Sequence, residues 1–236
     1  MQPSRSSSPS PRGYDLSLKH VAAATVTRFY FSYGVNMRGS AMRAKCAGSR
    51  AVGLALLRGH TWIVNALGLA NVVRTDRLRE VVGAAGNEAS PHTSDGGEGV
   101  YGVVYELQPD DERWLDVFQD TAEKYRKWVL DVELIRGPPG STTTTTTTTV
   151  PALVYLNSSR RCMVPRWPRE ARYADKMNRA IDCARDKFQL PDGYVEKAIR
   201  PTISASLESQ RYSEIEDLDE VLDQPILTRA EINFWK

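Results

Sequence analysis

Residues 49–73 carry the pattern that most restricts the fold, because short apolar segments are interrupted repeatedly by glycine. The stretch reads SRAVGLALLRGHTWIVNALGLANVV, with glycines at 53, 59 and 68. Glycine weakens a strand interior and often marks a tight bend, so the pattern predicts two or three short strands of a small curved sheet or barrel. The chain has 236 residues, 41% of them hydrophobic, which is enough for one sizeable core and one globular unit.

Further strands are expected on both sides of this stretch. TVTRFYFSYGV (25–35) and VYGVVYEL (100–107) are rich in β-branched and aromatic residues. KYRKWVLDVELI (124–135) alternates apolar and polar residues, and VPALVYLN (150–157) is expected to pair with it as a hairpin. These features are typical of strands.

Helical patterns alternate with the strands. Residues 37–45 and the start of 76–98 predict short helices, and PDDERWLDVFQDTA has acidic residues at its N-terminal end, as helices often do. From 168 to 200, apolar residues recur every three or four positions up to Pro191, where Asp192 is expected to cap a second short helix. The mixture predicts an α+β fold.

Two segments are expected to flank the globular domain at 26–203, and a third is expected to be inserted in it. Residues 1–25 are basic and Ser/Pro-rich and predict a disordered tail. Residues 137–149 form a low-complexity Thr insertion, because threonine with proline and glycine cannot bury a core. Residues 204–236 form an acidic C-terminal extension, with a helical apolar spacing at 213–224 that suggests a peripheral or partner-binding helix.

Composition limits the partners. Net charge is +2, from 31 basic and 29 acidic residues, so we expect no nucleic acid or anionic lipid partner. A small molecule or another protein is expected, and a homodimer is left open. The cysteines and histidines are too scattered for a disulfide framework or a metal site. No apolar run reaches the roughly 18 residues of a membrane span, and the N-terminal segment lacks the apolar run of a secretory signal, so the cytoplasm is the expected location.

In order and spacing, these segments resemble the γ-glutamylcyclotransferase family, especially its fungal members. The resemblance covers roughly residues 26–203 without the insertion and is carried by RFYFSYGVNM, Cys46, VGLALL, TWIVNALGLANVV, VYGVVYEL, LDVFQD, PREARYADKMNRAIDCA and LPDGYVEKAIRP. It implies a small mixed β-barrel flanked by helices and a reaction without a cofactor. In that reaction the α-amine of a γ-glutamyl group attacks its own γ-carbonyl, which closes 5-oxoproline and expels the remaining amine.

The family's Tyr-Gly-Ser-Asn loop corresponds to Tyr33, Gly34, Val35 and Asn36, with Val35 in place of serine. The resemblance implies that these residues bind substrate, because backbone N–H groups of a loop entering a helix suit a carboxylate or carbonyl oxygen. Without the resemblance, the same residues would indicate a tight turn whose side chains pack or cap a helix.

The family's acid/base glutamate lies in a Leu-Asp-x-x-Glu-Gly motif, with a tyrosine six residues beyond it. Leu115, Asp116 and Tyr125 align that motif without a gap, which places Gln119 on the glutamate and Asp120 on the glycine. An amide cannot titrate, and loss of general acid/base assistance costs about 10²- to 10⁴-fold in rate.

Two carboxylates are candidates to replace the glutamate. Asp120 is adjacent to Gln119 but points elsewhere, and Glu123 shares its face only if the helix continues. Gln119 itself keeps a donor and an acceptor for a substrate amine or carbonyl. Tyr125 is the one aromatic side chain predicted to contact substrate, since Trp62, Tyr101 and the neighbouring Asn65 have more of the character of core residues.

Two functions therefore remain open. The leading one is a γ-glutamylcyclotransferase-type lyase that acts on γ-glutamyl amino acids, glutathione or a glutathione conjugate. The alternative is a weakened or inactive relative that binds a γ-glutamyl-like ligand or a protein partner. A member recruited to a fungal secondary-metabolite pathway is a third reading.

Overall fold

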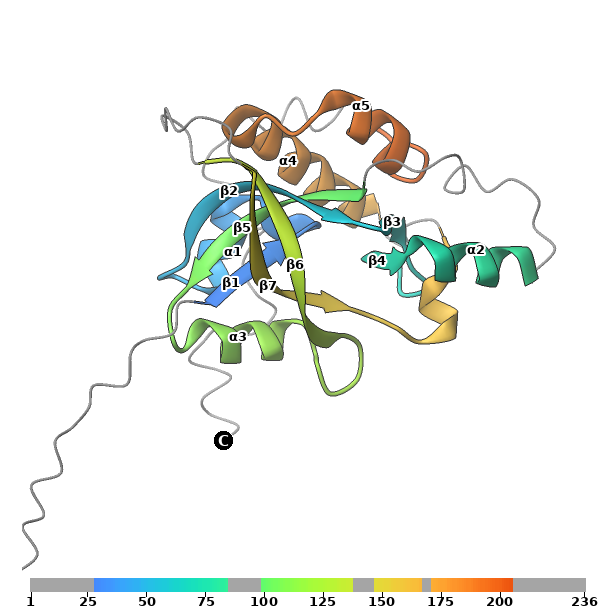
Figure 1. Cartoon of the computed structure of the whole chain (residues 1–236), viewed down its shortest axis with the longest axis horizontal. Helices are drawn as coiled ribbons and strands as arrows, with labels where there is room; N and C mark the ends of the chain where they lie inside the picture. The colour runs from blue at the N-terminus through green and yellow to red at the C-terminus, as the bar shows by residue number, and fades with distance from the viewer. Residues whose placement is uncertain (1–27, 85–98, 138–146, 167–170, 206–236) are drawn as a thin grey trace, which may run out of the picture.

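The computed structural model describes residues 28–84, 99–137, 147–166 and 171–205. Within them, five strands close into a barrel (Figure 1). In order around the barrel they are β1 (Arg28–Ser32), β5 (Gly99–Leu107), β2 (Arg50–Arg58), β6 (Arg126–Arg136) and β7 (Thr148–Leu156). β1 runs parallel to β7 and the other neighbours are antiparallel. The predicted α+β fold with a small mixed barrel is confirmed.

The glycine-rich stretch at 49–73 is divided between two sheets, where the sequence pattern predicted one. Only β2 joins the barrel, while β3 (His60–Val64) and β4 (Ala70–Arg74) pair with each other. The chain turns away at Gly59, whose φ of 68° favours glycine. α2 (Thr75–Ala84) packs on this pair, and Ile63, Val73, Leu78 and Val82 form a small second core.

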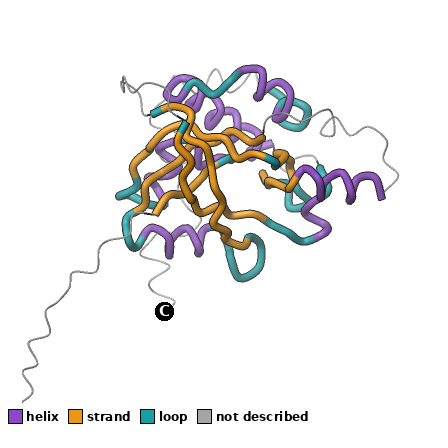
Figure 2. The backbone as a smooth tube through the Cα atoms, in the orientation of Figure 1, coloured by secondary structure: helices purple, strands orange, loops and turns teal. Residues whose placement is uncertain are grey.

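Helices surround the strands (Figure 2). A 3₁₀ turn, η1 (Val35–Met37), leads from β1 into α1 (Gly39–Lys45), and α3 (Asp111–Phe118) lies beside the opposite end of the barrel from α4 in Figure 1. The C-terminal part of the described chain contains η3 (Arg160–Met163), α4 (Ala171–Phe188), α5 (Asp192–Tyr194) and a π-helical turn, η4 (Val195–Ile199). None of the helices within the described ranges is long and apolar enough to cross a membrane.

The amphipathic pattern of α4 is confirmed, since Met177, Ile181 and Ala184 are fully buried. Asp192, however, lies in the first turn of α5, and Pro191 occupies the N-cap position. The Thr insertion also ends earlier than predicted, because Thr148 and the residue after it already pair with β6. β-branched threonine suits a strand once a partner strand is present. Residues 213–224 lie outside the described residues.

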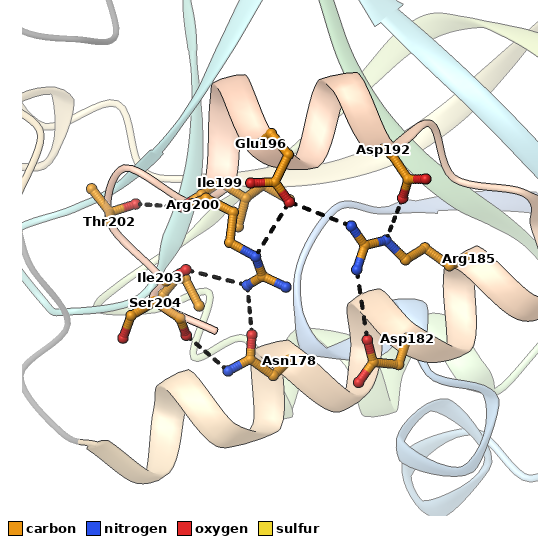
Figure 3. A network of polar contacts seen from close by, with 10 residues as sticks. All are labelled: Asn178, Asp182, Arg185, Asp192, Glu196, Ile199, Arg200, Thr202, Ile203 and Ser204. Atoms are coloured by element: carbon orange, nitrogen blue, oxygen red, sulfur yellow. Dashed lines mark hydrogen bonds and ion pairs between the residues drawn. The ribbon is translucent and has the colours of Figure 1, made fainter. Parts of the chain in front are cut away.

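A polar network fastens α4 to the chain that follows η4 (Figure 3). Arg200 Nη1 donates to Asn178 Oδ1 at 2.7 Å and to the Ile203 carbonyl at 3.2 Å. Asn178 Nδ2 donates to the Ser204 carbonyl at 3.0 Å. Because Asn178 is buried, its amide needs these partners, and the network fixes the segment after η4 against α4.

Candidate active site

The loop at 33–36, Gln119 and Tyr125 line one small cavity of about 190 Å³. Ligand pockets for whole drug-sized molecules typically span about 300–1,000 Å³, so this one suits a small head group. Its lining residues come from β1, η1, α1, β4, α3, β7, α4 and their connections: Tyr30, Ser32, Tyr33, Gly34, Val35, Asn36, Lys45, Leu69, Ala70, Phe118, Gln119, Tyr125, Tyr155 and Tyr173.

The loop is held in place through Tyr33. The Tyr33 hydroxyl donates to the Tyr155 carbonyl, and Trp62 Nε1 donates to the Tyr33 carbonyl at 3.0 Å. After the loop, the Tyr105 hydroxyl donates to the Met37 carbonyl at 3.0 Å. Trp62, a weaker sequence candidate, thus supports the loop from behind and does not line the cavity.

Close strand packing beside the loop depends on Gly102. A Cβ at this position would overlap the Ser32 carbonyl oxygen and the Phe31 ring. β5 therefore approaches the end of β1 more closely than any other residue there would allow. Ser32 lies one residue before Tyr33, so this contact also fixes the start of the loop.

Asn36 and Lys45 bring a positive charge to the cavity. Lys45 Nζ donates to Asn36 Oδ1 at 2.7 Å and to the Ala41 carbonyl at 3.3 Å. Asn36 Nδ2 in turn contacts the Tyr30 hydroxyl at 3.2 Å. Asn36 is buried, so both ends of its amide are oriented by these partners and an ammonium is fixed at the cavity wall.

Tyr125 is fastened from two sides. Its hydroxyl donates to the Ala70 carbonyl at 2.8 Å and accepts from Asn65 Nδ2 at 3.3 Å. The Ala70 N–H donates to the Tyr173 hydroxyl at 2.7 Å. Two tyrosines therefore hold both backbone groups of Ala70, and Asn65 acts by positioning Tyr125. Tyr101 instead lies 5.1 Å from the Tyr194 ring, centroid to centroid.

Gln119 follows the last residue of α3 and lines the cavity, whereas neither Asp120 nor Glu123 does. The helix ends at Phe118 because Asp120 adopts a φ of 50°, in the left-handed region. Glu123 therefore does not share a helical face with Gln119, and its side chain is exposed. The Asp120 carboxylate instead pairs with Lys124 at 3.0 Å.

The Asp120 conformation also explains what the sequence resemblance implied at this position. The related motif carries glycine there, and a left-handed residue just after a helix is commonly glycine. Aspartate tolerates this conformation better than most other residues. Asp120 thus adopts a turn conformation that glycine also favours, and the side chain before it, Gln119, is an amide.

The Asp116 carboxylate lies next to the cavity and is bonded to one of its lining residues, Tyr155. The Tyr155 hydroxyl donates to Asp116 Oδ1 at 2.7 Å. The other carboxylate oxygen of Asp116 accepts from Lys127 Nζ at 2.7 Å, and Lys127 also pairs with Glu112 at 2.7 Å. Asp116 does not line the cavity, so any influence on a ligand passes through the Tyr155 hydroxyl.

The cavity walls hold neutral phenols and one ammonium, with no aspartate or glutamate among the lining residues. Burial raises the pKa of Tyr33 and of Tyr125, and burial together with the hydrogen bond to Asp116 raises the pKa of Tyr155. Burial likewise raises the pKa of Tyr173. These hydroxyls therefore stay protonated at neutral pH and act as hydrogen-bond donors and acceptors.

Ser32 has a buried hydroxyl and lines the cavity. Burial raises the pKa of Tyr30, and a hydrogen bond with Ser32 is among the influences that lower it. Because a hydroxyl both donates and accepts, the Ser32 side chain is suited to a ligand atom as well. Sequence reasoning missed Ser32 and Tyr30, although both lie two residues apart on the strand leading to the loop. It also missed Lys45 and Tyr155, whose contacts with the loop are made only in the folded chain.

A larger cavity, of about 960 Å³, lies between the β3–β4 pair, α2 and β6. Its floor is largely apolar and includes Trp128 and Met163. Three arginines on its wall already pair with acidic residues: Arg58 with Glu133, Arg74 with Asp76 and Arg77 with Glu80. None of the sequence-predicted site residues lines it.

Comparison with known proteins places the barrel among solved structures. No protein-family model and no curated protein sequence matches the chain. A structure described as a γ-glutamyl cyclotransferase superposes with a TM-score of 0.52 at 16% identity, covering 80% of this chain and 98% of the other. The chain has the γ-glutamyl cyclotransferase fold.

Two further structures show the same fold. An uncharacterized protein from Homo sapiens matches with a TM-score of 0.52 at 16% identity, over 80% of this chain and 98% of the other. A yeast γ-glutamyl cyclotransferase described as specific to glutathione matches with a TM-score of 0.50 at 13% identity, over 79% and 96%. At these identities the likeness is one of fold, and activity has to be argued from the cavity.

Proposed function

We propose that the chain is a γ-glutamylcyclotransferase-type lyase of low rate, which releases 5-oxoproline from a γ-glutamyl amino acid, glutathione or a glutathione conjugate. The observation that carries this proposal is the meeting of the 33–36 loop, Gln119 and Tyr125 in one small cavity of a barrel with the cyclotransferase fold. The cavity takes the γ-glutamyl head group, and the rest of the substrate extends outward.

The charges of the cavity suit that head group. Lys45 supplies a cation for the α-carboxylate, and the buried Ser32 hydroxyl lines the same cavity. Gln119 offers an amide donor for the γ-carbonyl oxygen or an acceptor for the α-ammonium. Val35 contributes no hydroxyl, so Ser32 is the residue that supplies one at this end of β1.

The absence of a lining carboxylate supports a second candidate, a relative that binds a γ-glutamyl-like ligand without turning it over. In that case Gln119 holds the ligand and the reaction lacks its proton carrier. Both candidates bind a small molecule, and for both we propose a cytoplasmic location. A homodimer stays a prediction.

Turnover separates the two candidates. Purified protein is incubated with a γ-glutamyl dipeptide, and 5-oxoproline is quantified for the wild type and for Gln119→Glu. We expect slow release by the wild type and a rise of about 10²-fold or more in the variant, because a titratable oxygen returns to the cavity. Gln119→Asn is the matched control and should gain nothing. Silence from both the wild type and Gln119→Glu would contradict a lyase of this type.

A further inference from the structure

Tyr155 connects the cavity to the carboxylate of Asp116 by a hydrogen bond. Tyr155 is among the residues that line the cavity, and its hydroxyl donates to Asp116 Oδ1 at 2.7 Å. A phenol oxygen that donates one hydrogen bond keeps lone pairs for a second partner. The hydroxyl can therefore accept a proton on the cavity side while it gives its own proton to Asp116.

The surroundings of Asp116 keep it in position for such a transfer. Lys127 Nζ holds its second oxygen at 2.7 Å and also binds Glu112 at 2.7 Å. Although partial burial lowers it, the pKa of Lys127 is raised overall by hydrogen bonds to Asp116 and Glu112. The lysine thus remains an ammonium that fixes the carboxylate at its outer oxygen and leaves Oδ1 to Tyr155.

We infer that Tyr155 is a catalytic residue of this site and that Asp116, acting through it, exchanges the proton that glutamate would carry at position 119. This inference rests on the proposed lyase function. Gln119 then serves as a hydrogen-bonding group for the substrate. Asp116 positions the Tyr155 hydroxyl and takes up its proton through the hydrogen bond between them.

The proton balance closes over one turnover. The substrate α-ammonium loses a proton to the Tyr155 oxygen as the Tyr155 proton moves to Asp116. The free amine forms a bond to the γ-carbonyl carbon. When the bond to the leaving nitrogen breaks, the proton returns from Asp116 through Tyr155 to that nitrogen. The attacking nitrogen gives up its remaining extra proton to the freed amine, which departs as an ammonium, and Asp116 is again a carboxylate.

Two acidic residues around Lys127 make a matched pair for the test. Asp116 and Glu112 both bind Lys127 at 2.7 Å, but only Asp116 is bonded to Tyr155. Initial rates of 5-oxoproline release from a γ-glutamyl dipeptide are measured for the wild type, Asp116→Asn, Tyr155→Phe and Glu112→Gln. We expect kcat to fall about 10²-fold or more in the first two variants with KM little changed, and to stay within about twofold in Glu112→Gln.

A second set of variants distinguishes loss of the proton transfer between Tyr155 and Asp116, here called the relay, from loss of the fold. Asp116→Asn combined with Gln119→Glu should recover 5-oxoproline release, because a glutamate at position 119 can take up and return the proton without Tyr155 and Asp116. Asp116→Asn combined with Tyr155→Phe should be no slower than either single variant, since both break one chain of transfers.

One outcome overturns the inference and leaves the lyase standing, and others overturn both. An Asp116→Asn variant with the wild-type kcat would contradict the relay through Tyr155 and Asp116. A silent wild type beside an active Gln119→Glu variant would contradict both the relay and wild-type lyase activity, and would leave the second candidate, a relative that binds without turnover. Silence from wild type and Gln119→Glu together removes both proposals.

Discussion

The Tyr125 hydroxyl joins segments that meet at the cavity, through its bonds to the Ala70 carbonyl and Asn65 Nδ2. Tyr125→Phe leaves both of these groups without a partner in a buried setting. We expect the free energy of unfolding to fall by about 1–3 kcal/mol, measured by urea denaturation. An unchanged unfolding free energy would show that neither bond contributes to folding.

His60 makes stability depend on pH. Burial lowers its pKa from 6.5, and Arg74 lowers it further, although the Arg58 carbonyl and Asp76 act in the opposite direction. Because the folded pKa lies below the unfolded one, the unfolded state binds more protons as pH falls. The stabilising contribution is present above the unfolded pKa and is lost as pH falls through the folded pKa.

Denaturant unfolding at about pH 7.5 and about pH 5.5 measures this effect, with the unfolded pKa of histidine near 6.5 between them. We expect the wild type to lose stability on acidification and His60→Gln to lose less. Equal losses in the two proteins would assign the pH dependence to other groups.

At the scale of elements, the end of α4 has a conformation that glutamine does not favour. Gln189 has a φ of 57°, its N–H donates to the Arg185 carbonyl at 3.0 Å, and the Leu190 N–H donates to the Ala184 carbonyl at 3.1 Å. This arrangement is a helix end that commonly carries glycine.

Gln189→Gly should therefore stabilise the protein by about 1 kcal/mol, because the left-handed conformation costs a residue with a Cβ roughly that amount. Thermal and urea unfolding measure the change. The matched control is Lys187→Gly, an exposed site within α4, where glycine should destabilise by about 1 kcal/mol. A loss of stability in both variants would contradict the helix-end explanation.

Elements could be predicted where a periodic pattern decides them. The strand predicted at 124–135 and the apolar stripe of α4 rest on local signals, and both elements are present. The alternation itself is not kept throughout β6, because the adjacent Trp128 and Val129 are both exposed. The separation of β3–β4 from the barrel could not be predicted, because it depends on α2 covering Ile63 and Val73. The end of α3 at Phe118 depends on the backbone of Asp120, and an exposed polar residue gives little indication of that conformation.

The site residues likewise divide into those that a sequence motif predicted and those that only the folded chain brings together. Tyr33 to Asn36, Gln119 and Tyr125 were predicted from a resemblance in motif, and they meet in one cavity. Lys45 and Tyr155 belong to no local pattern that marks them. Lys45 contacts Asn36, nine residues before it, once η1 and α1 are formed. Tyr155 contacts Asp116 across 39 residues of sequence, which needs the folded barrel.

For the molecule as a whole, the domain end at 203 stays a prediction, and the contacts of residues 203 and 204 suggest a way to test it. Ile203 is fully buried, its carbonyl accepts from Arg200, and the Ser204 carbonyl accepts from Asn178. A chain ending after residue 205 keeps these contacts, whereas one ending after residue 201 loses them.

We expect the version ending at 205 to unfold at the same urea midpoint as the full chain. The version ending at 201 should lose about 3 kcal/mol, from the buried isoleucine and the two hydrogen bonds. Equal midpoints for the two truncated chains would show that α4 does not depend on the network in Figure 3.

The cavity beside the 33–36 loop combines the Lys45 ammonium, neutral tyrosines and the Gln119 amide, where the sequence resemblance implies a glutamate. Titration calorimetry of the wild type with a γ-glutamyl dipeptide and with its α-linked isomer tests this arrangement most directly. The account predicts saturable one-to-one binding of the γ-linked peptide and much weaker binding of the α-linked one. No binding of the γ-linked peptide, or equal binding of the two, would contradict it.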